Sequence, residues 1–363
     1  MNIYTITCHD VYNAGASLQA YALISYLVHQ GHNARIINYK PPYLSNHYAL
    51  WGRITPRYDK PILRLLYQLI KFPGRFINRI GKRKRAFDNF RKSFLRLTEK
   101  RYNSIKELRQ SPPDADVYFA GSDQIWNTLF PNGKDPAFYL DFLPNSKVKA
   151  SYAASFATDY IEKKYHSEIK TRLNKLDFIS VRECSGLQIL EELGIQRGTQ
   201  VMDPVFLLSC EQWQAMESNF YTKNHYILVC DFDGNEELKR YAQKISNDNG
   251  WKIYSYLPCD YADCSFSNNG PQTFLSLIHH AELIISNSFH ATAFSLIYEK
   301  NFVVFSRNEN LNTRMSDLLN LIESPARQYP RDYTTIRPRI QRAIEKSKFF
   351  IDTVLNSAKQ NNV

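Results

Sequence analysis

Short apolar runs alternate along this chain with segments in which apolar residues recur every three or four positions. Such runs predict strands, and the three-to-four spacing predicts helices. The predicted strands are 2–7, 34–39, 116–120, 138–142, 148–154, 178–183, 200–202, 226–231, 251–257, 281–285 and 302–305. The predicted helices are 18–30, 62–80, 87–97, 161–176, 185–193, 236–247, 272–280, 313–321 and 339–355. This alternation is typical of an α/β fold with parallel sheets.

The length of the chain, 363 residues with 44% hydrophobic content, exceeds that of one ordinary domain and fits two. The turn Asp203-Pro204 marks the expected boundary. We therefore predict an N-terminal domain at 1–205, with a basic helical insertion at about 50–105, and a second domain at 206–330. A closing helix and a polar tail occupy 331–363.

Positive charge is concentrated in one segment. Residues 53–101 contain sixteen Lys and Arg against three acids, a net of +13, which leaves −2 for the rest of a chain whose total is +11. Basic and apolar residues at helical spacing suit an anionic membrane surface, although a solvated helical hairpin over the core fits equally. We expect no nucleic-acid partner, because no nucleic-acid motif accompanies the charge.

The cysteines and the apolar runs favour a cytoplasmic protein. Six cysteines are scattered without paired spacing, which is typical of reduced thiols. No leader pattern and no apolar run of about 18 residues is visible. The basic segment leaves open a peripheral position on the inner face of the cytoplasmic membrane. The pair His279-His280, with Glu282 nearby, has no second ligand pair, so we interpret it as cations at a helix end and expect no metal.

One histidine lies between a predicted strand and a predicted helix. The strand is 281–285, and Phe294, Ile297 and Tyr298 give the helical period that follows. His290 is therefore expected beyond the carboxyl end of a strand and at a helix N-terminus, where parallel sheets bind ligands. There it could act as an acid or a base near neutral pH. A capping turn with a core-facing histidine explains the same pattern, and both interpretations stay open.

Three other strand ends carry candidate residues. Asn13 and Gly15 follow the first strand without the G-x-G-x-x-G of a dinucleotide site, so a plain turn and an anion cradle both fit. Gly121 permits a tight turn that would project Asp123 at the sheet edge, and an Asp-capped turn is the alternative. Arg182, next to a glutamate, is either an anion ligand or half of a structural salt bridge.

Five motifs together resemble a known family. They are Asn13-x-Gly15-x-x-Leu18-Gln19-Ala20, Gly121-Ser122-Asp123-Gln124-Ile125-Trp126, Ser180-Val181-Arg182-Glu183, Asp203-Pro204 and Ser288-Phe289-His290-Ala291-Thr292. In this order they resemble the polysaccharide pyruvyl transferase family over most of residues 2–322. That family is similar in architecture to GT-B glycosyltransferases. The resemblance therefore implies two Rossmann-like domains facing a cleft, with a C-terminal helix that crosses back.

The resemblance also implies an activity. It is transfer of pyruvate from phosphoenolpyruvate to sugar hydroxyls, as a ketal, in the synthesis of capsules and other cell-surface polysaccharides. Phosphoenolpyruvate would be a co-substrate, with no further cofactor, and the acceptor would be a glycan, free or lipid-linked. His290 would be the general acid, and Asp123 a base or acceptor ligand. Donor-binding residues would be Arg182, Ser288 and Arg314. Residues binding the acceptor or an anion would be Asn13, Gly15, Gln19, Gly121 and Ser122.

Two positions depart from the family pattern, and two other functions remain open. Ser288 stands where some members have Arg, and Ala291 where many have Gly; Arg314 or Arg307 would supply the missing cation. One alternative function is that of a GT-B-like glycosyltransferase using a nucleotide sugar. The other is a non-catalytic scaffold of envelope assembly, held at the membrane surface by residues 53–101.

Overall fold

Parallel strands form the sheet of the first half in this computed structural model, which describes residues 1–44, 81–220, 222–307 and 313–360. The sheet has the order β3-β2-β1-β4-β5. Its strands are β1 (Asn2–Ile6), β2 (Asn33–Tyr39), β3 (Leu97–Tyr102), β4 (Val117–Ala120) and β5 (Val148–Ser151). Bridges from Ala150 to Phe178 and from Ala154 to Val181 continue it into the pair β6 (Ile179–Val181) and β7 (Gly198–Gln200).

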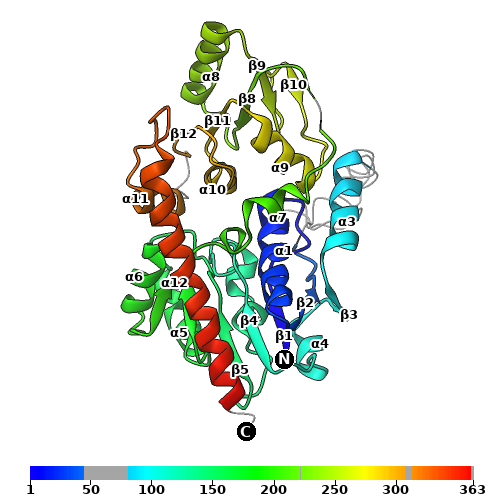
Figure 1. The fold of residues 1–363 in the computed structure, drawn as a ribbon. Coiled ribbons are helices and arrows are strands. Elements are labelled where there is room, and N and C mark those ends of the chain that lie inside the picture. The colour runs from blue at the N-terminus through cyan, green and yellow to red at the C-terminus, as the bar shows by residue number, and fades with distance from the viewer. Residues whose placement is uncertain (45–80, 221, 308–312, 361–363) are drawn as a thin grey trace, which may run out of the picture.

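A second sheet has the same strand order, β10-β9-β8-β11-β12. Its strands are β8 (Tyr226–Cys230), β9 (Lys252–Ser255), β10 (Cys264–Ser265), β11 (Leu283–Ser286) and β12 (Phe302–Val304). Helices and sheets thus form two Rossmann-like domains, one above the other in Figure 1. The α/β fold with two such domains is confirmed, while the domain boundaries at 205 and 330 stay predictions.

Helices connect the strands in both domains. The helices of the first half are α1 (Ala14–His29), α3 (Lys82–Phe94), α4 (Ile105–Gln110), α5 (His166–Leu173) and α6 (Cys184–Glu192). Those of the second half are α7 (Cys210–Gln214), α8 (Glu236–Asn249), α9 (Pro271–His280), α10 (Phe289–Ile297), α11 (Thr313–Ile322) and α12 (Tyr333–Gln360). Short 3₁₀ turns are Pro131–Lys134, Pro136–Tyr139, Lys163–Tyr165 and Pro204–Leu207.

The central strands are buried on both faces, as parallel sheets covered by helices require. All residues of β4, β8 and β11 are buried, which is why these segments read as continuous apolar runs. Each run ends at a polar turn on the edge of the sheet that faces the other domain. The fold therefore brings the strand-end turns of both halves together.

The C-terminal helix α12 starts beside α11 and runs back along the first domain, as Figure 1 shows. Ile351, Val354 and Ala358 are buried on its inner face, and the Met202 backbone N–H donates to Ser347 Oγ at 2.8 Å. The helix starts six residues before the predicted start at 339, because Asp332 caps it by accepting from the Thr334 backbone N–H. In the parts of the chain that the structure describes, no helix is both long and apolar enough to cross a membrane.

One predicted element is wrong, and one predicted helix ends earlier than expected. The apolar run 138–142, predicted as a strand, forms a 3₁₀ turn at Pro136–Tyr139 because Asp135 caps its start and Tyr139 stacks on Trp126. Leu97, predicted on a helical face, instead begins the edge strand β3. The run 138–142 is apolar because it is buried, and burial does not select between a strand, a helix and a turn.

The apolar face of α3 packs on the protein. Phe87 and Phe90 are buried, and the rings of Phe90 and Phe94 contact Tyr21 of α1 at 6.4 and 6.2 Å between centroids. This face is therefore not available to a membrane, contrary to what its sequence allowed. The rest of the expected membrane segment, 53–80, lies outside the described residues, and membrane contact there stays a prediction.

Candidate active site between the domains

A cavity of about 270 Å³ lies between the two domains. The first domain lines it with the turn before α1 and with Asp123, and the second domain lines it with the start of α10. Three arginines line it: Arg83, Arg307 and Arg314. Among the described lining residues, Asp123 is the one carboxylate. The cavity wall therefore carries a net positive charge, which suits a small polyanion.

His290 is the second residue of α10 and lines this cavity. Ser288 caps the helix, and its hydroxyl accepts from the Ala291 backbone N–H at 3.3 Å. His290 Nε2 lies 3.5 Å from Asp203 Oδ2, which is an ion-pair distance, and forms no hydrogen bond with a described residue. The Nδ1 edge faces Gly15 so closely that a Cβ at that position would lie 2.0 Å from Nδ1. Glycine at position 15 thus makes room for the imidazole.

Asp203, which the sequence analysis gave as part of a boundary turn and of a family motif but not as a site residue, contacts both His290 and Arg182. It is fully buried, and its carboxylate accepts from Ser122 Oγ at 3.3 Å, from the Val205 backbone N–H at 3.1 Å and from Arg182 Nη1. Burial alone would raise its pKa, but His290 and Arg182 outweigh that effect and hold the pKa of Asp203 well below its usual range. Asp203 is therefore a fixed negative charge beside the imidazole.

Arg182 directly follows β6 and is buried among carboxylates. Its Nη2 is 3.7 Å from Asp123 Oδ1 and its Nε 3.9 Å from Glu183 Oε2, in addition to the bond with Asp203. Burial opposes the charged form, but the three carboxylates outweigh it and raise the pKa of Arg182. Arg182 lines a second cavity of about 610 Å³, beside α11 and α12, rather than the one with His290. Its sequence-based role as a donor ligand stays a prediction.

The predicted alternative for Arg182, a structural pair with Glu183, describes only a minor contact. Glu183 Oε1 instead accepts from Ser155 Oγ, the Phe156 N–H and the Ala157 N–H at 2.8 to 3.0 Å. Glu183 is fully buried and fixes the loop that follows β5. The main hydrogen-bond partner of Arg182 is Asp203, which is distant from it in the sequence and close only in the fold.

Arg314 reaches both cavities from the start of α11. Its guanidinium lies 5.8 Å from the centre of the Phe289 ring, and that of Arg182 lies 4.8 Å from the same ring. Arg314 Nη1 is 3.9 Å from Asp123 Oδ1. Burial first, and then repulsion by Arg182, lower the pKa of Arg314 to about 10. An arriving anion would relieve both costs, so Arg314 is suited to bind one.

Asp123 has a backbone conformation that few residues other than glycine adopt, with φ at 72°. Its carbonyl accepts from the Ile125 N–H at 2.7 Å and the Ser155 N–H at 3.0 Å, which keeps the turn in place. The side chain consequently projects into the cavity, as the sequence predicted for this strand end. Strained residues of this kind cluster at functional sites.

The predicted acceptor or anion ligands fall into two groups. Asn13 and Gly15 line the cavity with His290, and Asn13 Oδ1 caps α1 by accepting from the Ala16 N–H at 3.1 Å. Gln19, Gly121 and Ser122 are not among the described residues that line either of the two cavities.

These three residues support the turns behind the site. Gln19 Nε2 donates to Thr7 Oγ1 at 3.1 Å, and Thr7 Oγ1 donates to the Ser122 carbonyl at 2.9 Å. A Cβ at Gly121 would lie 3.1 Å from Thr7 Cβ. Ser122 supports Asp203, as described above. Their contact with a ligand stays a prediction.

Several lining residues were not found as candidates from the sequence. Arg83 of α3 reaches the cavity because its guanidinium donates to the Ser267 carbonyl at 2.6 Å and to the Tyr12 carbonyl at 3.1 Å. It was counted only as part of the basic segment. Phe232, after β8, and Phe289 were also missed. The signal available for Phe289 was its place next to His290, whereas nothing local distinguished Arg83 from its neighbours.

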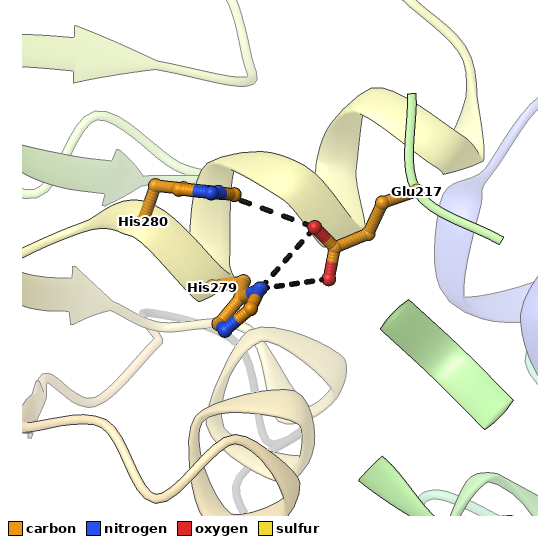
Figure 2. A group of neighbouring side chains, drawn as sticks. All are labelled: Glu217, His279 and His280. Carbon is orange, nitrogen blue, oxygen red and sulfur yellow. Dashed lines mark hydrogen bonds and ion pairs between the residues drawn. The ribbon is translucent and has the colours of Figure 1, made fainter. Parts of the chain in front are cut away.

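The two histidines at the end of α9 have a partner other than Glu282. Figure 2 shows both imidazoles facing Glu217, with His279 Nδ1 at 3.0 Å and His280 Nδ1 at 4.0 Å from its carboxylate oxygens. Glu282 pairs with His225 instead, at 2.7 Å. His280 Nδ1 also lies 2.9 Å from the Ser276 carbonyl, so this nitrogen already has an acceptor. The group joins the segment after α7 to α9.

Fold and site define a two-domain α/β protein with a GT-B-type cleft and a charged interdomain cavity. The sequence matches the polysaccharide pyruvyl transferase family over residues 13–309, and the chain belongs to this family. No curated protein sequence matches the chain.

Solved structures share the fold at low identity. The UDP-N-acetylglucosamine 2-epimerase from Rickettsia bellii is 13% identical with a TM-score of 0.51, over 100% of this chain and 98% of that chain. The S. aureus MnaA–UDP structure is 10% identical with a TM-score of 0.50, over 95% and 87%. At these identities the likeness concerns the fold alone.

Proposed function

We propose that this chain transfers pyruvate from phosphoenolpyruvate to two hydroxyls of a glycan, forming a cyclic ketal. Membership of the polysaccharide pyruvyl transferase family supports the transfer and the glycan acceptor. The proposal adds the donor and the residues that act on it. The observation that supports it most is the interdomain cavity, where three arginines and His290 face a single carboxylate among the described lining residues.

The charge of the cavity and its hydrogen-bond donors suit the donor substrate. Phosphoenolpyruvate carries a carboxylate and a phosphate on three carbons, and the planar fork of arginine binds either group through two hydrogen bonds. Arg314 has a buried Nε without a hydrogen-bond partner among the described residues, so it has a donor to offer. Helices α1 and α10 both begin at the cavity, and the partial positive charge at their N-termini favours a bound anion.

His290 is the proposed general acid. It gives a proton to the methylene carbon of the donor, which becomes a methyl group as positive charge develops on the neighbouring carbon. Its Nε2 faces Asp203, so Nδ1, beside Gly15, is the nitrogen left for proton transfer. The buried carboxylate of Asp203, next to Nε2, fixes the orientation of the imidazole.

Two sugar hydroxyls then add to the same carbon, and the bond from that carbon to the phosphate oxygen breaks. One hydroxyl proton replaces the proton that His290 gave, and the other leaves with inorganic phosphate. We assign to Asp123 the role of accepting a proton from an attacking hydroxyl, because its carboxylate lines the same cavity as His290. Atoms and charge balance with phosphoenolpyruvate and a diol as reactants and a pyruvyl ketal and phosphate as products.

The test is incubation of the chain with phosphoenolpyruvate and a panel of lipid-linked and nitrophenyl glycosides. We expect release of phosphate and the mass gain of one pyruvyl ketal. Titration calorimetry distinguishes pyruvyl transfer from the alternative enzyme activity. Binding heat with phosphoenolpyruvate supports pyruvyl transfer, and binding heat with UDP or GDP alone supports a nucleotide-sugar glycosyltransferase. No turnover with any glycoside and no heat with phosphoenolpyruvate would end the proposal.

A further inference from the structure

The second domain presents one exposed phenylalanine to the interdomain cavity. Five aromatic residues line the cavity: Tyr12, Phe232, Tyr256, Phe274 and Phe289. Of these, Tyr256 and Phe274 are buried, whereas Phe232 is 42% exposed. An exposed phenyl ring forgoes the stabilisation that burial would give it. A ring in this position is therefore a candidate surface for a ligand.

The loop that carries Phe232 is fixed at both ends. The Phe232 backbone N–H donates to Asn287 Oδ1 at 2.9 Å, and Asn287 Nδ2 donates to Asp231 Oδ1 at 2.8 Å and to Asp233 Oδ1 at 2.6 Å. The Asn235 N–H donates to Asp231 Oδ2 at 2.8 Å. Because Asn287 directly precedes the cap of α10, these bonds set the position of the ring relative to the catalytic helix.

The surroundings of the Phe232 ring suit a ligand that stacks on one aromatic face rather than one held between two rings. Arg307 lies over Phe232 at 4.9 Å from the ring centre. Among the aromatic pairs of the described residues, none includes Phe232, so no second ring faces it. A flat nucleobase gains most between two parallel rings. A hexose ring gains from a single aromatic face, because its axial C–H bonds point at the negative face of the π-system.

The lining of the cavity combines charged and aromatic groups. Arg314, His290 and Asp123 line the same cavity as Phe232, and Arg307 lies over the Phe232 ring. We propose that Phe232 is the stacking platform for the hexose ring that accepts pyruvate, an inference that rests on the proposed pyruvyl transfer. A hexose on the Phe232 ring would lie in the same cavity as His290 and Asp123, the two residues that its hydroxyls must reach for the transfer.

Direct binding tests the platform without the donor. Methyl glucoside, methyl galactoside and methyl mannoside are mixed in turn with the unaltered chain, and saturation-transfer NMR reports which sugar protons contact it. We expect transfer to the C–H protons of one sugar face, and its loss in Phe232→Ala but not in Phe232→Trp. Phe349→Ala, which alters a ring on α12 that is 72% exposed, is the matched control.

Kinetics give the second measurement. Phe232→Ala should raise the acceptor KM about tenfold, with kcat and the KM for phosphoenolpyruvate unchanged. The proposal is overturned if no methyl hexoside binds the unaltered chain. It is also overturned if Phe232→Ala binds the hexosides as tightly as the unaltered chain does, or if Phe232→Ala keeps hexoside binding and loses UDP binding. Loss of sugar binding in Phe232→Ala, in a chain that turns over no phosphoenolpyruvate, would support the platform and refute the proposed function.

Discussion

The two domains have the same strand order, yet their equivalent turns carry different chemistry. β4 and β11 each occupy the fourth place in their sheet. The turn after β4 places the carboxylate of Asp123 in the cavity from a left-handed backbone, and the turn after β11 starts a helix that carries His290. A shared topology therefore fixes where the turns meet, and the side chains on each turn decide what they do there.

The turns after β1 and β8 differ in the same way. After β1, Gly15 leaves space that the imidazole of the other domain occupies. After β8, Phe232 fills space with an exposed ring. The first domain thus contributes room, fixed negative charge and Arg83, and the second contributes the imidazole, Arg307, Arg314 and an exposed aromatic ring. Removing each contribution in turn tests this division.

The largest expected effect is that of His290→Ala, which removes the proposed acid from the second domain. Turnover should fall by about 10²–10⁴-fold, the usual contribution of general acid catalysis. Ketal formation followed by mass spectrometry measures it, and thermal unfolding should stay near that of the unaltered chain. His225→Ala, at an exposed histidine on the same domain, is the control. Full activity of His290→Ala would refute the acid role.

Next in size is Gly15→Ala, which changes only the first domain. The added methyl would lie 2.0 Å from His290 Nδ1, so the imidazole must move, and a shift of about 1 Å costs roughly 10²-fold in rate. Gly270→Ala, at another helix start, adds a methyl with its nearest neighbour at 3.2 Å and should leave kcat unchanged. Equal kcat values for Gly15→Ala and Gly270→Ala would show that the position of the imidazole does not affect the reaction.

The third comparison sets Arg314→Gln against Arg182→Gln. Loss of Arg314 should raise the KM for phosphoenolpyruvate about ten- to a hundredfold, the value of one or two charged hydrogen bonds. Loss of Arg182 leaves buried carboxylates without their cation and should lower the free energy of unfolding by about 3–5 kcal/mol. Steady-state kinetics and urea unfolding measure both.

The same pair tests the role that the family resemblance implied for Arg182, which is binding of the donor. A stable Arg182→Gln chain with a raised donor KM would support that role. A destabilised chain whose donor KM is normal would assign Arg182 to the scaffold of the first domain, and the donor to Arg314.

The smallest expected effect concerns acid stability. The pKa of Asp203 in the folded chain is below its ordinary value of 3.8, so Asp203 stabilises the fold fully above that value and progressively less as the pH falls below it. Asp203→Asn removes this contribution. Urea unfolding measures the free energy of unfolding at pH 6 and at pH 3. The decrease from pH 6 to pH 3 should be smaller in Asp203→Asn than in the unaltered chain, and equal decreases would contradict the assignment.

Asp203→Asn also tests the orientation of the imidazole. Without the carboxylate that faces Nε2, the imidazole loses the group that orients it, so kcat should fall while the KM for phosphoenolpyruvate stays unchanged. An unchanged kcat would show that Asp203 supports only the fold. Ser122→Ala, which removes one hydrogen bond to the same carboxylate, should give a weaker change in the same direction.

The pattern of apolar runs determined most of the elements, because parallel strands buried on both faces must be continuously apolar. It also placed His290 at a strand-to-helix junction, since the period of burial changes from a run to a three-to-four spacing there. The run at 138–142 shows the limit, because capping by Asp135 and the stack of Tyr139 on Trp126 produced a buried turn.

The chain by itself determined the two α/β halves, the family motifs and most of the polar residues at the strand ends. Only the tertiary structure decided that Asp203 rather than Glu183 is the main partner of Arg182, that Gly15 meets His290, and that Arg83 reaches the cavity. The physical reason is distance along the chain. Local spacing encodes burial and backbone geometry, whereas charge pairing and steric fit between residues of different elements depend on how those elements pack.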